Sequence, residues 1–211
     1  MVFDFDGTLA ELNIDFSAMR TALLKLMADT NLPGNGIAHL PILELMEAAG
    51  SQLAQRNPHL KQKFLDAALQ IVTGIEMDAA RRGRLYDGVR ALLTELRARS
   101  IQIGVVTRNC RSAVYTVFPD IDWYCQAILA REDSPRVKPH PDHLRATLNV
   151  LGISPADAVM IGDHPMDIRL GRETGTDTIG VLTGSADRVT LLQERADLII
   201  DHISDIMRII S

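Results

Sequence analysis

The sequence lacks several features that mark whole classes of protein. Its 211 residues include only two cysteines, Cys110 and Cys125, which form neither a C-x-x-C pair nor a zinc-binding spacing. No stretch approaches the roughly 18 apolar residues that a membrane-spanning helix needs, and residues 1–6 carry no basic start of a targeting signal. No lysine and arginine run is long enough to follow a nucleic-acid backbone. We therefore expect reduced thiols and a cytoplasmic protein that binds neither membranes nor nucleic acids.

The composition is that of a folded chain, with 46% apolar and 23% charged residues and a formal net charge of −5. A small anionic ligand stays compatible with this charge, because a binding site needs only local positive charge. Short apolar runs, continuous and not alternating, are separated by helical patterns, which favours parallel strands covered on both faces. The sequence therefore predicts a doubly wound α/β domain. The runs lie at residues 1–5, 101–106, 126–129, 159–161, 178–182 and 197–200.

The interval between about residues 11 and 84 departs from this alternation. It has no convincing strand and three stripes of apolar residues at helical spacing. The first stripe includes Phe16, Met19 and Leu23. We therefore predict a helical subdomain inserted after the first strand. Two helix starts are also expected in the core, at Asp87 and at Ser154.

Residues 4–8 read Asp-Phe-Asp-Gly-Thr and follow the first predicted strand. An open α/β sheet binds ligands at the carboxyl ends of its strands, and Asp4 and Asp6, two apart on extended backbone, should point the same way. One carboxylate could attack phosphorus while the other handles the proton of the leaving group. The alternative is a calcium loop, which also begins Asp-x-Asp-Gly; the buried strand before the segment argues against it.

Two further segments supply groups that suit a phosphate. Thr107 ends the strand predicted at residues 101–106, and its hydroxyl and the following N–H groups could hold phosphate oxygens. Lys138 precedes a helix expected over residues 143–151 and could offset the repulsion between a carboxylate and a phosphate. Taken singly, a threonine at a strand end is more often structural, and a lysine among prolines is more often a solvated loop charge.

The fourth segment, residues 160–167, places Asp163 and Asp167 four residues apart where a strand ends. Their hard oxygen atoms suit magnesium, and an i, i+4 pair on a helix could face one ion. Asp167 has a structural alternative, the capping of that helix. His164 is interpreted as a loop residue, because magnesium rarely binds imidazole.

In this order and spacing, the four segments resemble the haloacid dehalogenase-like hydrolase superfamily over nearly the whole chain. The resemblance implies a Rossmann-like parallel-sheet core of residues 1–11 and 85–211, with residues 12–84 as an inserted, mobile, all-helical cap. That cap, and residues 180–184 and 196–200, are similar to the subgroup with phosphoglycolate phosphatases and β-phosphoglucomutases. The implied function is a Mg²⁺-dependent phosphatase that hydrolyses small phosphorylated metabolites, with 2-phosphoglycolate as the first candidate.

The resemblance also implies a role for each motif residue. Asp4 would be the nucleophile that forms an aspartyl-phosphate, and Asp6 would be the general acid and base. Residues implied to bind the transferring phosphoryl group or the rest of the substrate are Thr107, Arg108, Asn109 and Lys138. Residues implied to hold Mg²⁺ are Asp4, Asp6 through its backbone carbonyl, Asp163 and, in support, Asp167.

Other activities stay open at this point. A carboxylate at Asp6 disfavours dehalogenation, since a halide leaving group needs no proton. Arg108 and Asn109 depart from the asparagine-lysine pair common in phosphoglycolate phosphatases, so the substrate contact there is open. Alternatives in the same superfamily are a sugar-phosphate mutase and a nucleotide or pyrophosphate hydrolase. A non-catalytic binding protein is the alternative from another class, and the sequence carries no indication of oligomeric state.

Overall fold

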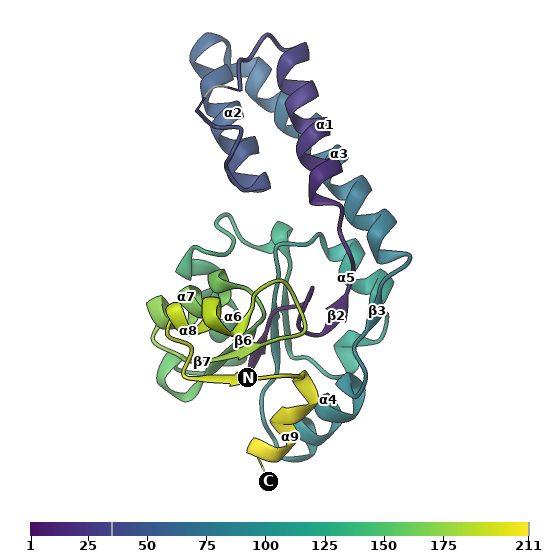
Figure 1. The fold of residues 1–211 in the computed structure, drawn as a ribbon, viewed down its shortest axis with the longest axis vertical. Coiled ribbons are helices and arrows are strands. Elements are labelled where there is room, and N and C mark those ends of the chain that lie inside the picture. The colour runs from purple at the N-terminus through teal and green to yellow at the C-terminus, as the bar shows by residue number, and fades with distance from the viewer. Residues whose placement is uncertain (35, 211) are drawn as a thin grey trace. The chain divides into compact units, whose positions relative to one another are not determined.

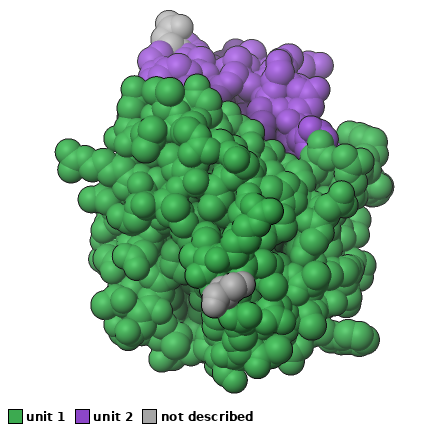
Figure 2. All heavy atoms as spheres, turned by 60° about the horizontal axis from the view of Figure 1, so that its bottom comes forward, with its two compact units in different colours: residues 1–12, 80–211 green, residues 13–79 purple. Residues whose placement is uncertain are grey.

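A computed structural model describes residues 1–34 and 36–210 (Figure 1). The chain as described forms two compact units, residues 1–12 with 80–211 and residues 13–79, which Figure 2 colours separately. Among the helices of the described residues, none is long and apolar enough to cross a membrane.

The larger unit is built on a parallel sheet, with six strands in the described part of the chain and the order β5-β4-β1-β6-β7-β8 (Figure 1). Val2 pairs with Gly104 on one side and with Met160 on the other, so β1 is an interior strand. Each strand overlaps a predicted apolar run, which confirms the doubly wound α/β class. The strands are β1 (Val2–Phe3), β4 (Gly104–Val106), β5 (Ala127–Leu129), β6 (Val159–Gly162), β7 (Asp177–Val181) and β8 (Leu198–Ile200).

Both faces of this sheet are covered. Val105 and Val106 point to opposite faces, and both are fully buried. Leu144 and Leu148 of α6 and Leu170 of α7 belong to the core cluster that packs on the sheet. The helices of this unit are α4 (Val89–Ala98), α5 (Arg111–Val117), α6 (Pro141–Leu151), α7 (Pro165–Thr174), α8 (Arg188–Gln193) and α9 (Ile206–Ile209). Short 3₁₀ turns lie at Ile121–Trp123, Arg131–Asp133, Pro155–Asp157 and Ile203–Asp205.

One of the two predicted helix starts is displaced by one residue, and the other begins only a short helical turn. Gly88, not Asp87, is the N-cap of α4, and its φ of 80° is a left-handed conformation that glycine adopts without steric cost. Ser154 begins only a 3₁₀ turn, because the chain becomes extended at Ala158 to enter β6.

A short antiparallel ribbon lies at the ends of the insertion, where no strand was expected. Strand β2 (Ala10–Glu11) pairs with β3 (Arg84–Leu85), and an ion pair of 2.8 Å joins Arg84 to Glu11. Strands of two residues are too short to leave a periodic pattern in the sequence. Residues 12 and 80–84 group with the larger unit, although the prediction assigned them to the insertion.

The smaller unit consists of α1 (Phe16–Asp29), α2 (Ile42–Arg56) and most of α3 (Pro58–Ala80). Asp15 caps α1, its side chain accepting a 2.8 Å hydrogen bond from the N–H of Ala18. The apolar stripe of α1 differs from the predicted one, since Phe16 is 58% exposed. The core of this unit is formed by Met19, Leu23, Met27, Leu32, Ile42, Leu45, Met46, Ala49, Leu53, Phe64, Ala68 and Val72.

Candidate active site

The strand order brings three of the predicted segments to one edge of the sheet. Asp4 follows β1, Thr107 follows β4 and Asp163 follows β6, and β4 and β6 are the two neighbours of β1. The order of the strands reverses at β1, and such a reversal is where doubly wound sheets leave a crevice for ligands. Asp4, Thr107 and Asp163 are all buried.

Lys138, from the segment between β5 and α6, joins this edge. Its ammonium lies 2.6 Å from Asp4 Oδ1 and 2.8 Å from Asp167 Oδ1, and its side chain is 4% exposed. Burial opposes the charged form, yet the nearby carboxylates of Asp167 and Asp4 keep the pKa of Lys138 above its ordinary value. Lys138 is therefore a buried cation among carboxylates and not a solvated loop charge.

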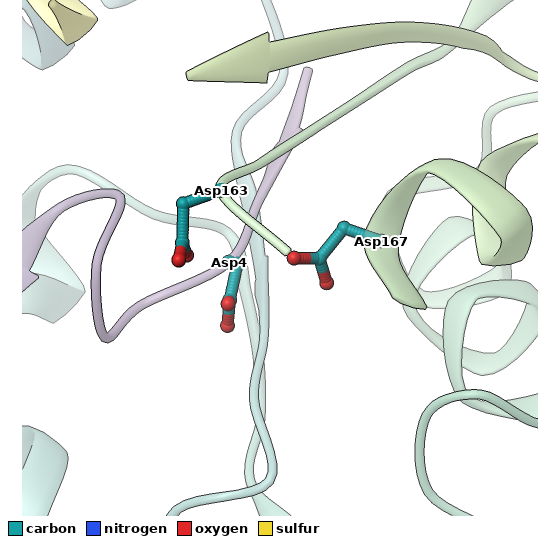
Figure 3. Close-up of side chains that lie close together, drawn as sticks. All are labelled: Asp4, Asp163 and Asp167. Atoms are coloured by element: carbon teal, nitrogen blue, oxygen red, sulfur yellow. The ribbon is translucent and has the colours of Figure 1, made fainter. Parts of the chain in front are cut away.

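Among the described residues, Asp4, Asp163 and Asp167 form a buried group whose candidate ligand atoms all lie within 4.8 Å of one another. Figure 3 shows these side chains extending from the segment after β1, the segment after β6 and the first turn of α7 toward the same region. We call this group the acidic cluster. Burial raises the pKa of Asp4 well above its ordinary value, although the charge of Lys138 opposes the rise, and burial together with the charge of Asp167 also raises the pKa of Asp163. The raised pKa values reflect the poor hydration of these buried carboxylates, which disfavours their charged form.

Asp163 is held from several sides. Its Oδ1 accepts a hydrogen bond of 3.3 Å from the Thr8 hydroxyl, and its Oδ2 accepts bonds of 2.8 and 3.2 Å from the N–H and hydroxyl of Ser185. A Cβ on Gly7 would lie 2.5 Å from the Asp163 carboxyl carbon, and one on Gly184 only 1.9 Å from Oδ2. Glycine is thus required on both sides of this carboxylate. Sequence reasoning missed Ser185, which stands in a turn with no recognisable pattern.

The turn that carries Ser185 is connected to the segment after β1. The hydroxyl of Thr183 donates to the Gly7 carbonyl at 2.6 Å, and the Tyr86 hydroxyl donates to the Thr183 carbonyl at 2.8 Å. Burial raises the pKa of Tyr86 to about 12, so its hydroxyl keeps the proton that it donates. These bonds hold the turn beside Asp163.

Asp167 has the helix-capping role that the sequence offered as its structural alternative, and it also pairs with Lys138. Its Oδ2 accepts a bond of 3.2 Å from the N–H of His164, as a helix-capping residue does, while its Oδ1 accepts from Lys138. His164 is not a plain loop residue as predicted, because it is the N-cap of α7, with Nδ1 accepting from the N–H of Met166 at 3.0 Å.

Asp6 lies just before a tight turn of the chain. Strand β1 ends at Phe3, and the N–H groups of Leu9 and Ala10 both donate to the Phe5 carbonyl. One Asp6 carboxylate oxygen accepts from the N–H of Leu12 at 3.0 Å, and this carboxylate is not part of the acidic cluster found among the described residues.

The loop after β4 is held by its own groups and by Arg131. Thr107 Oγ1 accepts from the N–H of Asn109 at 3.2 Å. The N–H of Arg131 donates to the Asn109 carbonyl at 3.1 Å, and its Nη1 donates to the Arg108 carbonyl at 3.3 Å. Both Thr107 and Asn109 are buried, whereas Arg108 is partly exposed.

His143 contacts the backbone of Lys138. The sequence did not indicate a role for this residue. It is fully buried, and its Nδ1 accepts a bond of 3.1 Å from the backbone N–H of Lys138. Burial lowers the pKa of His143 to about 4, so the ring is neutral near pH 7 and its Nδ1 acts as an acceptor.

Comparison with known proteins identifies the family of the chain. The sequence model of the family described as haloacid dehalogenase-like hydrolase matches residues 1–181. The chain belongs to this family. The resemblance stated from the motifs is thereby confirmed.

Curated relatives match part of the chain. A pyrophosphatase PpaX of Bacillus cereus is 31% identical over 128 residues, which is 60% of this chain and 59% of the relative. The corresponding protein of Bacillus mycoides is 30% identical over 60% of each chain. The match therefore spans less than two thirds of these relatives.

Solved structures share the fold over nearly the whole chain. A predicted phosphoglycolate phosphatase from Haemophilus somnus has a TM-score of 0.68 and 23% identity, covering 100% of this chain and 96% of the other. A hydrolase from Pseudomonas syringae has a TM-score of 0.71 and 18% identity, covering 98% and 95%. At this identity the likeness concerns the fold alone.

Proposed function

We propose that the protein is a Mg²⁺-dependent phosphatase that hydrolyses small phosphorylated metabolites through an aspartyl-phosphate on Asp4. The observation that carries this proposal is the position of Asp4, buried at the reversal of strand order, beside the Lys138 ammonium and within the acidic cluster. A carboxylate in this place has a cation to offset its charge as it approaches a phosphate. Family membership supports the same reaction class.

The donor set fits Mg²⁺. The acidic cluster offers hard carboxylate oxygens, which magnesium prefers, and no thiol or imidazole belongs to it among the described residues. With Asp4, Asp163 and Asp167 ionised and Lys138 protonated, the formal charge is −3 + 1 = −2, which a divalent cation would balance. We propose that Asp4, Asp163 and the Asp6 carbonyl hold the ion, with Asp167 in support. When bound, Mg²⁺ would neutralise charge on the transferring phosphoryl group.

The residues of the chain would then carry out two displacements. An Asp4 oxygen attacks phosphorus as the ester P–O bond breaks, and Asp6 gives its proton to the departing alkoxide. In the second step Asp6 takes a proton from water, the water oxygen attacks phosphorus, and the Asp4 carboxylate is released with inorganic phosphate. Thr107, Asn109 and Lys138 would hold the phosphoryl oxygens, and His143 would keep Lys138 in place.

The substrate proposed first is 2-phosphoglycolate, from the resemblance to phosphoglycolate phosphatases. Inorganic pyrophosphate is the second candidate, because the curated relatives from Bacillus cereus and Bacillus mycoides are named pyrophosphatases. The alternatives of a nucleotide hydrolase and a sugar-phosphate mutase use the same core chemistry. Nucleotides and sugar phosphates therefore belong in the same substrate screen.

The test is hydrolysis of p-nitrophenyl phosphate and a panel of phosphorylated metabolites, with and without millimolar Mg²⁺, read as kcat/KM. We expect Mg²⁺-dependent turnover that Asp4→Asn lowers by at least about a thousandfold. Asp6→Asn should instead allow a slow build-up of phosphoenzyme that does not discharge, visible by mass spectrometry. Turnover by Asp4→Asn at the rate of the natural protein would show that this carboxylate is not the nucleophile.

A further inference from the structure

Both strands of the β2–β3 ribbon are connected by hydrogen bonds to one residue, Thr183. On the side of β2, the Gly7 N–H donates to the Ala10 carbonyl at 2.7 Å, and the Gly7 carbonyl accepts from the Thr183 hydroxyl at 2.6 Å. On the side of β3, Tyr86 directly follows Leu85, and its hydroxyl donates to the Thr183 carbonyl at 2.8 Å. The two strands of the ribbon therefore share one anchor in the turn after β7.

The same turn also holds a proposed metal ligand. It comprises residues 182–187, between β7 and α8, so neither element fixes its position. Ser185, two residues after Thr183, donates from its N–H and its hydroxyl to Asp163 Oδ2, at 2.8 and 3.2 Å. A displacement of Thr183 would move Ser185 as well, because consecutive Cα atoms are only about 3.8 Å apart. A continuous path of covalent bonds and hydrogen bonds thus joins the ribbon to Asp163.

Tyr86 is held in an orientation that suits this connection. Its N–H donates to the Leu9 carbonyl at 3.0 Å. Its ring meets the ring of His202 edge-on, with the centroids 6.0 Å apart and the planes at 83°. Replacement of Tyr86 by phenylalanine keeps this ring contact and the backbone bond, and it removes the hydroxyl that reaches the turn.

We propose that Tyr86 is a positioning residue that links the Mg²⁺ site to the β2–β3 ribbon through the turn at residues 182–187. This inference rests on the Mg²⁺-dependent phosphatase proposed above, and it gives the ribbon a role in metal binding. Tyr86 acts through Thr183 and Ser185 on Asp163, and not as a ligand itself. Because coupling between two sites is reciprocal, Mg²⁺ stabilises the paired ribbon by the same factor by which the paired ribbon strengthens Mg²⁺ binding.

The first measurement is the binding of Mg²⁺ alone, by isothermal titration calorimetry without substrate. Tyr86→Phe should weaken binding about 3- to 10-fold, the effect of one lost hydrogen bond between neutral groups. Thr183→Val removes the bond to Gly7 and should weaken binding by a similar factor, whereas Thr183→Ser keeps the hydroxyl and should bind as the natural protein does. Tyr115→Phe is the matched control, because it removes a tyrosine hydroxyl bond of 2.7 Å to Asp122, which is not part of the acidic cluster.

The second measurement tests the link in the opposite direction, by hydrogen exchange and mass spectrometry. Saturating Mg²⁺ should slow the exchange of the backbone amides of residues 84–86 about 3- to 10-fold in the natural protein, since the coupling factor is the same in both directions. Among these amides is the Tyr86 N–H that donates to Leu9. Tyr86→Phe should remove most of this protection, and Tyr115→Phe should retain it.

Three results would overturn the inference. They are Mg²⁺ binding by Tyr86→Phe as strong as that of Tyr115→Phe, ribbon exchange that Mg²⁺ does not slow in the natural protein, and protection by Mg²⁺ that persists in Tyr86→Phe. In each case Mg²⁺-dependent hydrolysis of p-nitrophenyl phosphate that requires Asp4 would still uphold the phosphatase. Absence of that hydrolysis, together with absence of Mg²⁺ binding, would overturn both proposals.

Discussion

Lys138→Met removes the buried ammonium from the acidic cluster while keeping a side chain of similar shape. In the folded protein this ammonium lies 2.6 Å from Asp4 and 2.8 Å from Asp167, with 4% of the lysine side chain exposed. Removal of one partner from a buried ion pair commonly costs about 3–5 kcal/mol, because the remaining charge stays buried without compensation. We expect Lys138→Met to lower the free energy of unfolding by this amount near pH 8, in the absence of Mg²⁺.

The loss should depend on pH in a definite direction. Burial raises the pKa of Asp4 above its ordinary 3.8, and Lys138 opposes this rise. Without Lys138, the folded variant keeps the Asp4 proton to a higher pH than the unfolded chain does. Since the folded state then binds more protons than the unfolded state, its stability falls as pH rises above the ordinary carboxyl range. The deficit of the variant relative to the natural protein should thus be larger near pH 8 than near pH 5.

The assay is urea unfolding followed by circular dichroism at both pH values, with EDTA present. The control is Arg188→Met, which breaks an ion pair of 2.6 Å whose side chains are 50% and 79% exposed. Exposed pairs contribute at most about 1 kcal/mol, so this variant should be nearly as stable as the natural protein at either pH. A loss for Lys138→Met no larger than that of the control, or an equal loss at both pH values, would refute the electrostatic account of the cluster.

The remaining predictions concern groups that hold the site in place. Ser185→Ala, which removes a hydroxyl bond to Asp163, should raise the Mg²⁺ concentration for half-maximal activity about 10-fold. Gly184→Ala should raise it further, because the new Cβ would lie 1.9 Å from an Asp163 oxygen; unchanged metal dependence in both variants would contradict a role of this turn. Burial lowers the pKa of His143 from 6.5 to about 4, so the unfolded chain binds more protons between these values and stability falls as pH decreases through them. His143→Asn should weaken this acid dependence in thermal unfolding, and an unaltered pH profile would argue against it.

Local pattern was sufficient for the strands of the sheet and for the positions of the motif residues. Continuous apolar runs mark strands buried on both faces, and each run is short enough to be recognised without knowledge of its neighbours. Asp4 and Asp163 directly follow strands β1 and β6, and they therefore lie at the carboxyl edge of the parallel sheet. The fold class therefore followed from information carried within a few residues.

Contacts between distant segments were decided only by the tertiary structure. The ribbon of β2 and β3 joins strands too short to have a pattern, and Ser185 meets Asp163 because β6 and β7 are neighbours in the sheet. The ion pairs of Lys138 join it to Asp4 and to Asp167, which are both far from it in the sequence. A hydrogen bond or ion pair depends on the distance between two atoms, and chain folding alone sets that distance when the partners are far apart in sequence.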